Sequence, residues 1–124
     1  MININYTEEI LFKAKTKDGG KWIEGYLFKI WDKSYILWGT TNGIPNMTEV
    51  IPETVCQYIF RSDINGKKIF TDDIVLTQKF EQKVECVVEF EIGFVATYKK
   101  DGIKYYTNIM ADSNAFEIIG NIHD

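Results

Sequence analysis

The chain of 124 residues has few of the residues that build catalytic or metal sites, with one histidine and two cysteines. It also has only two prolines. Met1–Asn5 lacks the charged region and apolar run of a signal peptide. Without a signal peptide, Cys56 and Cys86 are expected to be reduced, buried thiols. No segment approaches the ~20 apolar residues that span a bilayer. We therefore expect a soluble, cytoplasmic protein with no membrane contact.

Catalytic motifs are also missing. Two thiols and one histidine make a poor zinc set, and there is no glycine-rich phosphate loop, H-x-x-x-H or C-x-x-C motif. His123 lies next to the C-terminus, where chains are often loosely held. We expect its side chain to lie at the surface without a positioned partner, which a general base would need. The protein is predicted not to be an enzyme and to carry no cofactor or metal.

Positive charge is not in excess. The chain has 14 lysines and arginines against 18 aspartates and glutamates, which gives a net charge of −4. A protein that binds nucleic acid needs a clustered basic face, because binding releases counterions from the phosphates. We therefore expect no nucleic-acid partner.

The chain is rich in apolar and aromatic residues, which make up 45% and 15% of it. That composition lies well outside the range of disordered chains. Domains of about 100–150 residues are the usual size. We predict one domain over residues 1–124 with a real hydrophobic core.

Turn signals divide the sequence into short runs of β-branched and aromatic residues, as strands prefer. Pairs such as Asn42-Gly43, Asn65-Gly66 and Asp101-Gly102 tolerate the positive φ of tight hairpin turns. The expected strands are Ile10–Lys15, Trp22–Ile30, Tyr35–Gly39, Gln57–Arg61, Lys68–Phe70, Val84–Phe90, Phe94–Lys99, Ile103–Thr107 and Phe116–Ile119. We predict a mainly β fold, an antiparallel barrel or sandwich of short strands with little helix.

Two segments leave helix open, and with it an α+β arrangement. Thr7–Glu9 could cap a helix over Ile10–Lys15, although alternation there favours a strand. Asn108–Ala115 is compatible with one short helical turn. The loop Gly39–Asn46 is expected to move as a lid or a contact loop.

Asp72-Asp73 is the best acidic candidate for chemistry. Neighbouring carboxylates can bind a divalent cation or share a proton, but adjacent strand residues point to opposite faces. The favoured interpretation is a turn in which Asp72 supplies the bend and Asp73 accepts a backbone N–H.

An aromatic cluster is the most promising binding feature, because six large aromatic residues fall between Trp22 and Trp38. Alternation places Trp22, Tyr26 and Phe28 on one side of a strand, with Ile23 and Leu27 opposite. They pack the core or form a surface that binds a partner. Glutamates near Val84–Phe90 form an expected acidic edge. The predicted partner-binding residues are Trp22, Tyr26, Trp31, Tyr35, Trp38, Glu85 and Glu89.

Four segments resemble the YopX family of small phage and prophage proteins. The family pattern I-x-F-R-A-W is similar to Ile10–Lys15, and a Trp followed by Gly-Tyr is similar to Lys21–Tyr26. The long pattern V-x-P-E-T-V-x-Q-Y-T-G-L-x-D-x-N-G-K-x-I-F-E-G-D-I-V is similar to Val50–Val75, and F-E-V-I-G-N-I-Y to Phe116–His123. The resemblance covers residues 10–123. It implies a phage or prophage origin and a compact β fold, with no activity to transfer.

The chain departs from the family pattern at two glycines. Phe60 replaces the glycine of Thr-Gly-Leu, which is expected to remove a tight bend after Tyr58. Asp72 replaces the glycine of Glu-Gly-Asp, and an aspartate can hold positive φ at some cost.

Three functions remain open. The first is a non-enzymatic phage-type protein that engages a bacterial host protein in the host cytoplasm, and in its sharper form inhibits an immune system of the host. The alternative is a sponge that binds a nucleotide-like signal in an aromatic pocket, with lysines such as Lys13, Lys15, Lys21 and Lys29 near the phosphates. The third is a metal-dependent hydrolase that uses Asp72 and Asp73. Self-association into a homo-oligomer is expected for each.

Overall fold

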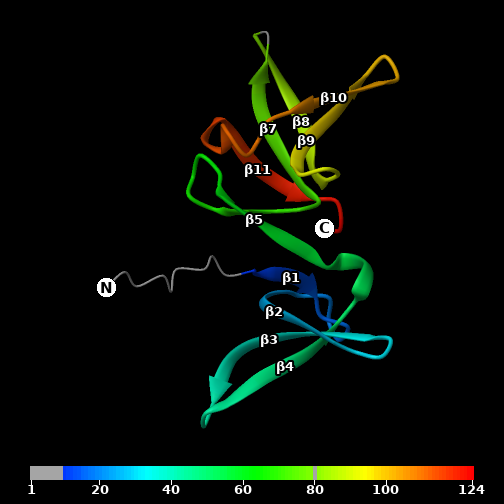
Figure 1. Cartoon of the computed structure of the whole chain (residues 1–124), viewed down its shortest axis with the longest axis vertical. Helices are drawn as coiled ribbons and strands as arrows, with labels where there is room; N and C mark the ends of the chain where they lie inside the picture. Colours follow the sequence, from blue (N-terminus) through cyan, green and yellow to red (C-terminus); the bar gives the residue numbers. More distant parts are fainter. Residues whose placement is uncertain (1–9, 80) are drawn as a thin grey trace. The chain divides into compact units, whose positions relative to one another are not determined.

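A computed structural model describes residues 10–79 and 81–124 (Figure 1). The predictions for Met1–Asn5 and for a cap at Thr7–Glu9 lie outside these residues. The chain divides into two compact units, 1–57 and 58–124. One domain over the whole chain therefore stays a prediction. No helix in the described part is long and apolar enough to cross a membrane.

The first unit is an antiparallel sheet built from successive strands. They are β1 (Phe12–Lys15), β2 (Trp22–Ile30), β3 (Lys33–Thr41) and β4 (Ile44–Val50), followed by the 3-10 turn η1 (Pro52–Thr54). The strand order is β4-β3-β2-β1, and the start of β5 (Cys56–Ser62) pairs with β1. The core of this unit is small, with Ala14, Ile36 and Val50 buried at its centre.

The second unit contains the rest of β5, which pairs with β6 (Lys68–Phe70), and a five-stranded antiparallel sheet. The strands of that sheet are β7 (Asp73–Lys79), β8 (Gln82–Phe90), β9 (Phe94–Lys100), β10 (Ile103–Thr107) and β11 (Phe116–Asn121), and η2 (Ser113–Ala115) is a 3-10 turn. Their order is β10-β9-β8-β7-β11. Buried side chains from β5 through β11 form the larger core of the chain, around Ile59, Ile69, Val75 and Val88.

The turn chemistry explains two of the hairpins. Asn42 and Gly43 have φ of 53° and 78°, and Asp101 and Gly102 have φ of 54° and 77°. Positive φ at both central residues is the requirement of a type I′ turn, which suits the twist of the flanking strands. The register follows, with Thr41 opposite Ile44 and Lys100 opposite Ile103.

The mainly β prediction is confirmed, and three expected strands, Trp22–Ile30, Lys68–Phe70 and Ile103–Thr107, are β2, β6 and β10 with the same bounds. Residues Ile10–Lys15 contribute a strand, and the helical turn expected near Asn108–Ala115 is the short η2. Each described sheet has two ends, so neither closes into a barrel. The loop predicted at Gly39–Asn46 is wrong, because most of it belongs to the β3–β4 hairpin.

Candidate functional site

The two faces of the sheet in the first unit differ in exposure. Ile23 and Leu27 of β2 pack against the small core, and Gly25 between them is buried. Tyr26 and Phe28 point to the other face and are exposed. Their cross-strand partners on β3 are Leu37 and Tyr35, both half-buried. The predicted aromatic hairpin therefore has an outer apolar face, and the interpretation that it lies wholly in the core is wrong.

Trp31 lies at the tip of the β2–β3 hairpin and is 97% exposed. Its φ is 53°, in the left-handed region that bulky residues rarely adopt. The neighbouring hairpin turn uses Asn42-Gly43 for the same backbone conformation. A large apolar ring is thus held in a strained turn and exposed to solvent. Strain of this kind is concentrated at binding and catalytic sites.

The other predicted aromatic residues lie around this outer face. Trp22 is half-buried on β2, and the ammonium groups of Lys13 and Lys15 lie 4.7 and 5.6 Å from its ring centroid. Trp38 lies beyond the last β2–β3 pair, and its Nε1–H donates to the Thr48 hydroxyl at 2.8 Å. Alternation from buried Ile36 places Trp38 on the core side of the sheet, so it does not share the face of Tyr26.

A cleft of about 500 Å³ opens where β2 leaves β3. Tyr26 is the last residue of β2 to pair with β3, and Gly25 is the first to pair with β1. Only glycine fits there, because a Cβ atom at position 25 would overlap the carbonyl oxygen of Leu37. The residues that line the cleft are Glu24, Gly25, Tyr26, Leu37, Trp38, Gly39, Thr40 and Pro45. No sequence signal indicates this cleft, since it depends on a change of strand partner.

The glutamates predicted to form an acidic edge lie in the second unit, and that prediction is wrong in one respect. They belong to β8, which is the middle strand of its sheet, so they occupy a face rather than an edge. Glu85 is exposed. Glu89 accepts a hydrogen bond from the Thr97 hydroxyl at 2.7 Å, and Lys104 bridges it to Glu91 at 3.0 and 3.2 Å. Part of the acidic charge is therefore already compensated.

The Thr97 hydrogen bond is the main reason that the pKa of Glu89 lies below the usual 4.5, with Lys104 contributing further. Because the pKa of Glu89 is lowered on folding, this interaction contributes its full stabilisation at pH values above the unfolded-state pKa. The stabilisation is lost as the pH falls through the folded-state pKa. We expect Thr97→Val to lose about 1 kcal/mol at pH 7 and progressively less below about pH 4.5. Urea midpoints at pH 7 and pH 3 measure the difference.

The matched control is Thr77→Val, because Thr77 is similarly buried and donates to the carbonyl oxygen of Ala115 at 2.9 Å. A carbonyl does not titrate, so the loss at position 77 should be the same at both pH values. A loss at position 97 that does not shrink in acid would contradict the role given to Glu89.

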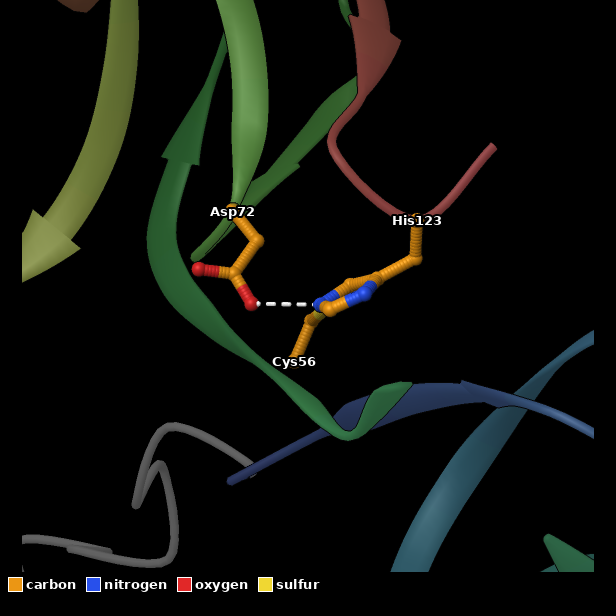
Figure 2. A group of neighbouring side chains, drawn as sticks. All are labelled: Cys56, Asp72 and His123. Carbon is orange, nitrogen blue, oxygen red and sulfur yellow. Dashed lines mark hydrogen bonds and ion pairs between the residues drawn. The ribbon is translucent and has the colours of Figure 1, made fainter. Parts of the chain in front are cut away.

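His123 does have a positioned partner, which corrects the expectation of a free surface side chain. Its Nε2 lies 2.9 Å from a carboxylate oxygen of Asp72, and both side chains are partly buried (Figure 2). The backbone N–H of Ile122 also donates to the Asp72 carbonyl at 3.0 Å. Cys56, drawn in the same figure, belongs to the first unit, where its thiol donates to the Thr54 carbonyl at 3.2 Å.

The described residues of either unit, taken alone, bring no three metal-ligating side chains together. Asp72 and His123 supply two ligand atoms in the second unit, and structural or catalytic zinc takes at least three from the protein. Cys56 and Cys86 are buried thiols that form no disulfide with each other, as predicted.

Buried carboxylates organise the second unit. Asp73 is 0% exposed and accepts the Phe70 backbone N–H at 2.8 Å and the Asn121 side-chain N–H at 2.9 Å. Asp63 is 4% exposed and accepts three backbone N–H groups, from Asn65, Lys67 and Ile118, each at 2.9 Å. The interpretation of Asp72 as the bend and Asp73 as an acceptor for a backbone N–H is confirmed, since Asp72 has φ of 70°.

A family model described as YopX protein matches residues 11–124, nearly the whole chain. The chain belongs to the YopX family. No curated protein sequence matches it.

The YopX signature can now be assigned to structure. Asp63, Asn65 and Gly66 form the β5–β6 turn, and Asp73 and Asn121 join the start of β7 to the end of β11. Phe60, at one of the two family glycines, still has φ of 65°, so the expected loss of the bend is wrong. These parts of the signature form interior contacts in the second unit of this YopX chain. The exposed aromatic face lies in the first unit, where Phe28 and Trp31 fall outside the four motifs and Tyr26 ends the Lys21–Tyr26 motif.

Proposed function

We propose that this YopX protein is a non-enzymatic binding protein that engages a bacterial host protein through the outer face of its first unit. The observation that carries the proposal is Trp31, which is both fully exposed and held at positive φ. Burying such a ring against a partner would recover its hydrophobic free energy. Tryptophan is also the residue type most enriched among the side chains that dominate protein–protein binding.

The rest of the outer face supports a protein partner rather than a nucleic acid. Tyr26 and Phe28 are exposed on β2, and Met47 is exposed on β4 opposite Leu37. Aromatic and methionine side chains are enriched at protein interfaces. A host protein as the partner, and inhibition of an immune system as the outcome, rest on the resemblance to phage and prophage proteins.

The test compares Trp31→Asn with wild type in affinity capture from bacterial lysate, followed by affinity measurement with the purified captured protein. Asparagine tolerates positive φ, so the turn should keep its conformation and the fold its stability. We expect Trp31→Asn to weaken binding by about 30-fold or more, the usual effect of removing an anchor residue. A captured partner that binds Trp31→Asn as tightly as wild type would remove the basis of the proposal.

The matched control is Ile92→Asn. Ile92 is also fully exposed, in the turn between β8 and β9 of the second unit. Its replacement removes an equally exposed apolar side chain and should leave partner binding unchanged. The immune form of the proposal predicts that wild type, and not Trp31→Asn, restores phage plaques on a host that carries the immune system.

The alternative function, a small-ligand sponge, is favoured by the cleft of about 500 Å³, which is in the size range of ligand pockets. Glu24 is the charged residue among those that line it, and no lysine or arginine is among them. Lys13 and Lys15 are placed against Trp22 instead. A phosphate group would meet a negative wall in this cleft, so its chemistry suits a neutral or cationic ligand better than a nucleotide.

A further inference from the structure

The cleft beside Tyr26 combines an aromatic ring with a carboxylate. Tyr26 contributes the ring, and Glu24, two residues earlier on the same side of β2, contributes the charge. Aromatic faces attract cations through their quadrupole, and the attraction grows when the cation is desolvated. A planar guanidinium satisfies both features, because it stacks on rings and forms paired hydrogen bonds with a carboxylate.

The cleft also offers an open strand edge. Thr40 of β3 lies opposite Pro45 of β4, and in the described part of the chain it has no strand partner on the β2 side. An edge of this kind leaves carbonyl oxygens and N–H groups without a ladder. Guanidinium carries five N–H donors and no acceptor, so carbonyl oxygens at such an edge are suitable partners.

The walls are held in place before any ligand arrives. The Nε1–H of Trp38 is bonded to Thr48, which fixes the orientation of the indole. Gly25, which also lines the cleft, brings β2 against the Leu37 carbonyl. A preformed site loses less conformational entropy on binding than one that must be ordered.

Lys13 is the cross-strand partner of Glu24, and its ammonium lies 4.7 Å from the Trp22 ring centroid. The same strand region therefore already places a cation on an aromatic face. A carboxylate has about four lone-pair sites, so Glu24 can accept from a second cation as well.

We infer that this cleft receives an arginine side chain of the protein partner. The inference rests on the proposed function and deepens it. The cleft and Trp31 lie at opposite ends of the β2–β3 pairing. Tyr26, beside the cleft, is five residues before Trp31, or about 15 Å along an extended chain. One protein surface can cover both. Arginine is, with tryptophan and tyrosine, among the residue types that dominate interfaces.

The first experiment needs no partner. Nα-acetyl-arginine-N-methylamide is titrated into the full chain, and the Trp38 Nε1–H signal is followed by NMR. The matched ligand is the citrulline analogue, which has the same shape and no charge. We expect the arginine compound to bind with a dissociation constant on the order of 1–10 mM, since one cation–π contact and one carboxylate contribute modestly. Binding of the citrulline analogue should be at least about tenfold weaker.

The variant Glu24→Gln should abolish the preference for arginine over citrulline. The control Glu53→Gln, at an exposed glutamate of η1 in the same unit, should not change it. Unshifted signals of Gly66 and Gly102 would show that the second unit remains folded. Equal binding of the two compounds, or shifts that bypass Trp38 and Gly39, would overturn the inference.

The second experiment uses the purified partner. We expect Glu24→Gln to weaken its binding by about tenfold, in line with loss of a charge-assisted pair. Partner binding that is insensitive to Glu24→Gln would overturn the assignment to a partner arginine. If the arginine compound binds but binding of the captured partner does not depend on Trp31, the proposed function fails on its own.

Discussion

Replacing Asp73 with alanine is expected to lower the free energy of unfolding by about 3–5 kcal/mol, the range seen when a buried polar network loses a charged member. The Asp73 carboxylate is fully buried and accepts the backbone N–H of Phe70 and the side-chain N–H of Asn121. Alanine would remove the acceptor of both of these hydrogen bonds, and a buried donor that loses its acceptor costs about 1–3 kcal/mol. Small domains have total stabilities of about 5–15 kcal/mol, so the loss is a large share.

A double variant separates the hydrogen bonds from the residue types that make them. In Asp73→Asn with Asn121→Asp, the side-chain oxygen of residue 73 can still accept the Phe70 N–H. Its amide can donate to residue 121, whose other oxygen can accept the His123 N–H that Asn121 binds at 2.9 Å. We expect this exchange to recover most of the stability that Asp73→Asn loses. A double variant no more stable than the single one would show that the pair acts through something else.

Urea unfolding measures these changes, with Asp112→Ala as the control because Asp112 is exposed in the same unit. All three tryptophans lie in residues 22–38, so their fluorescence follows the first unit alone. Far-UV circular dichroism follows the whole chain. If residues 1–124 are one cooperative domain, Asp73→Ala should move both midpoints together. A tryptophan transition that stays in place would show that the two units unfold separately.

The strands could be predicted because their signals are local. Alternation in Val84–Phe90 and the Asp101-Gly102 turn determine β8 and the β9–β10 hairpin without reference to the rest of the chain. The β3–β4 hairpin was missed, although Asn42-Gly43 marks its turn, because Pro45 and several polar residues hide the strand that follows. Pro45 is tolerated there because β4 is an edge strand of the sheet.

The candidate site could be predicted only in part. The sequence indicated Tyr26 and Trp31 as candidate binding residues and left their exposure open. The cleft depends on where β2 changes partner, which is a long-range property. At the two positions that replace family glycines, the side chain alone does not predict the backbone conformation. Phe60 and Asp72 keep positive φ although their side chains disfavour it, because the surrounding pairing determines the backbone. Local propensity was overruled at both positions by tertiary structure.

Asp63→Ala is the second change with a large expected effect, a loss of about 3 kcal/mol or more, because three charge-assisted hydrogen bonds disappear together. One carboxylate oxygen accepts from Asn65 and Lys67 within the β5–β6 turn, and the other accepts from Ile118 of β11. Asp63 therefore joins a local turn to a strand that lies 55 residues later in the chain.

Asp63→Asn divides these two roles. An asparagine oxygen can still accept from Asn65 and Lys67, but its amide would place a donor against the Ile118 N–H. We expect the turn to persist and the link to β11 to break, with an intermediate loss of stability. Amide hydrogen exchange at Lys67 and Ile118 measures the two contacts separately. Exchange should accelerate at both amides in Asp63→Ala and mainly at Ile118 in Asp63→Asn.

A backbone hydrogen bond next to the Asp63–Ile118 contact limits how far either variant should loosen this region. The Ile64 N–H donates to the Phe116 carbonyl at 2.9 Å, a bond that neither variant removes. Protection at Ile64 should therefore fall only as far as global stability falls. If Ile118 keeps its protection in Asp63→Asn, the β11 contact does not depend on the carboxylate, and Asp63 would act only within its turn.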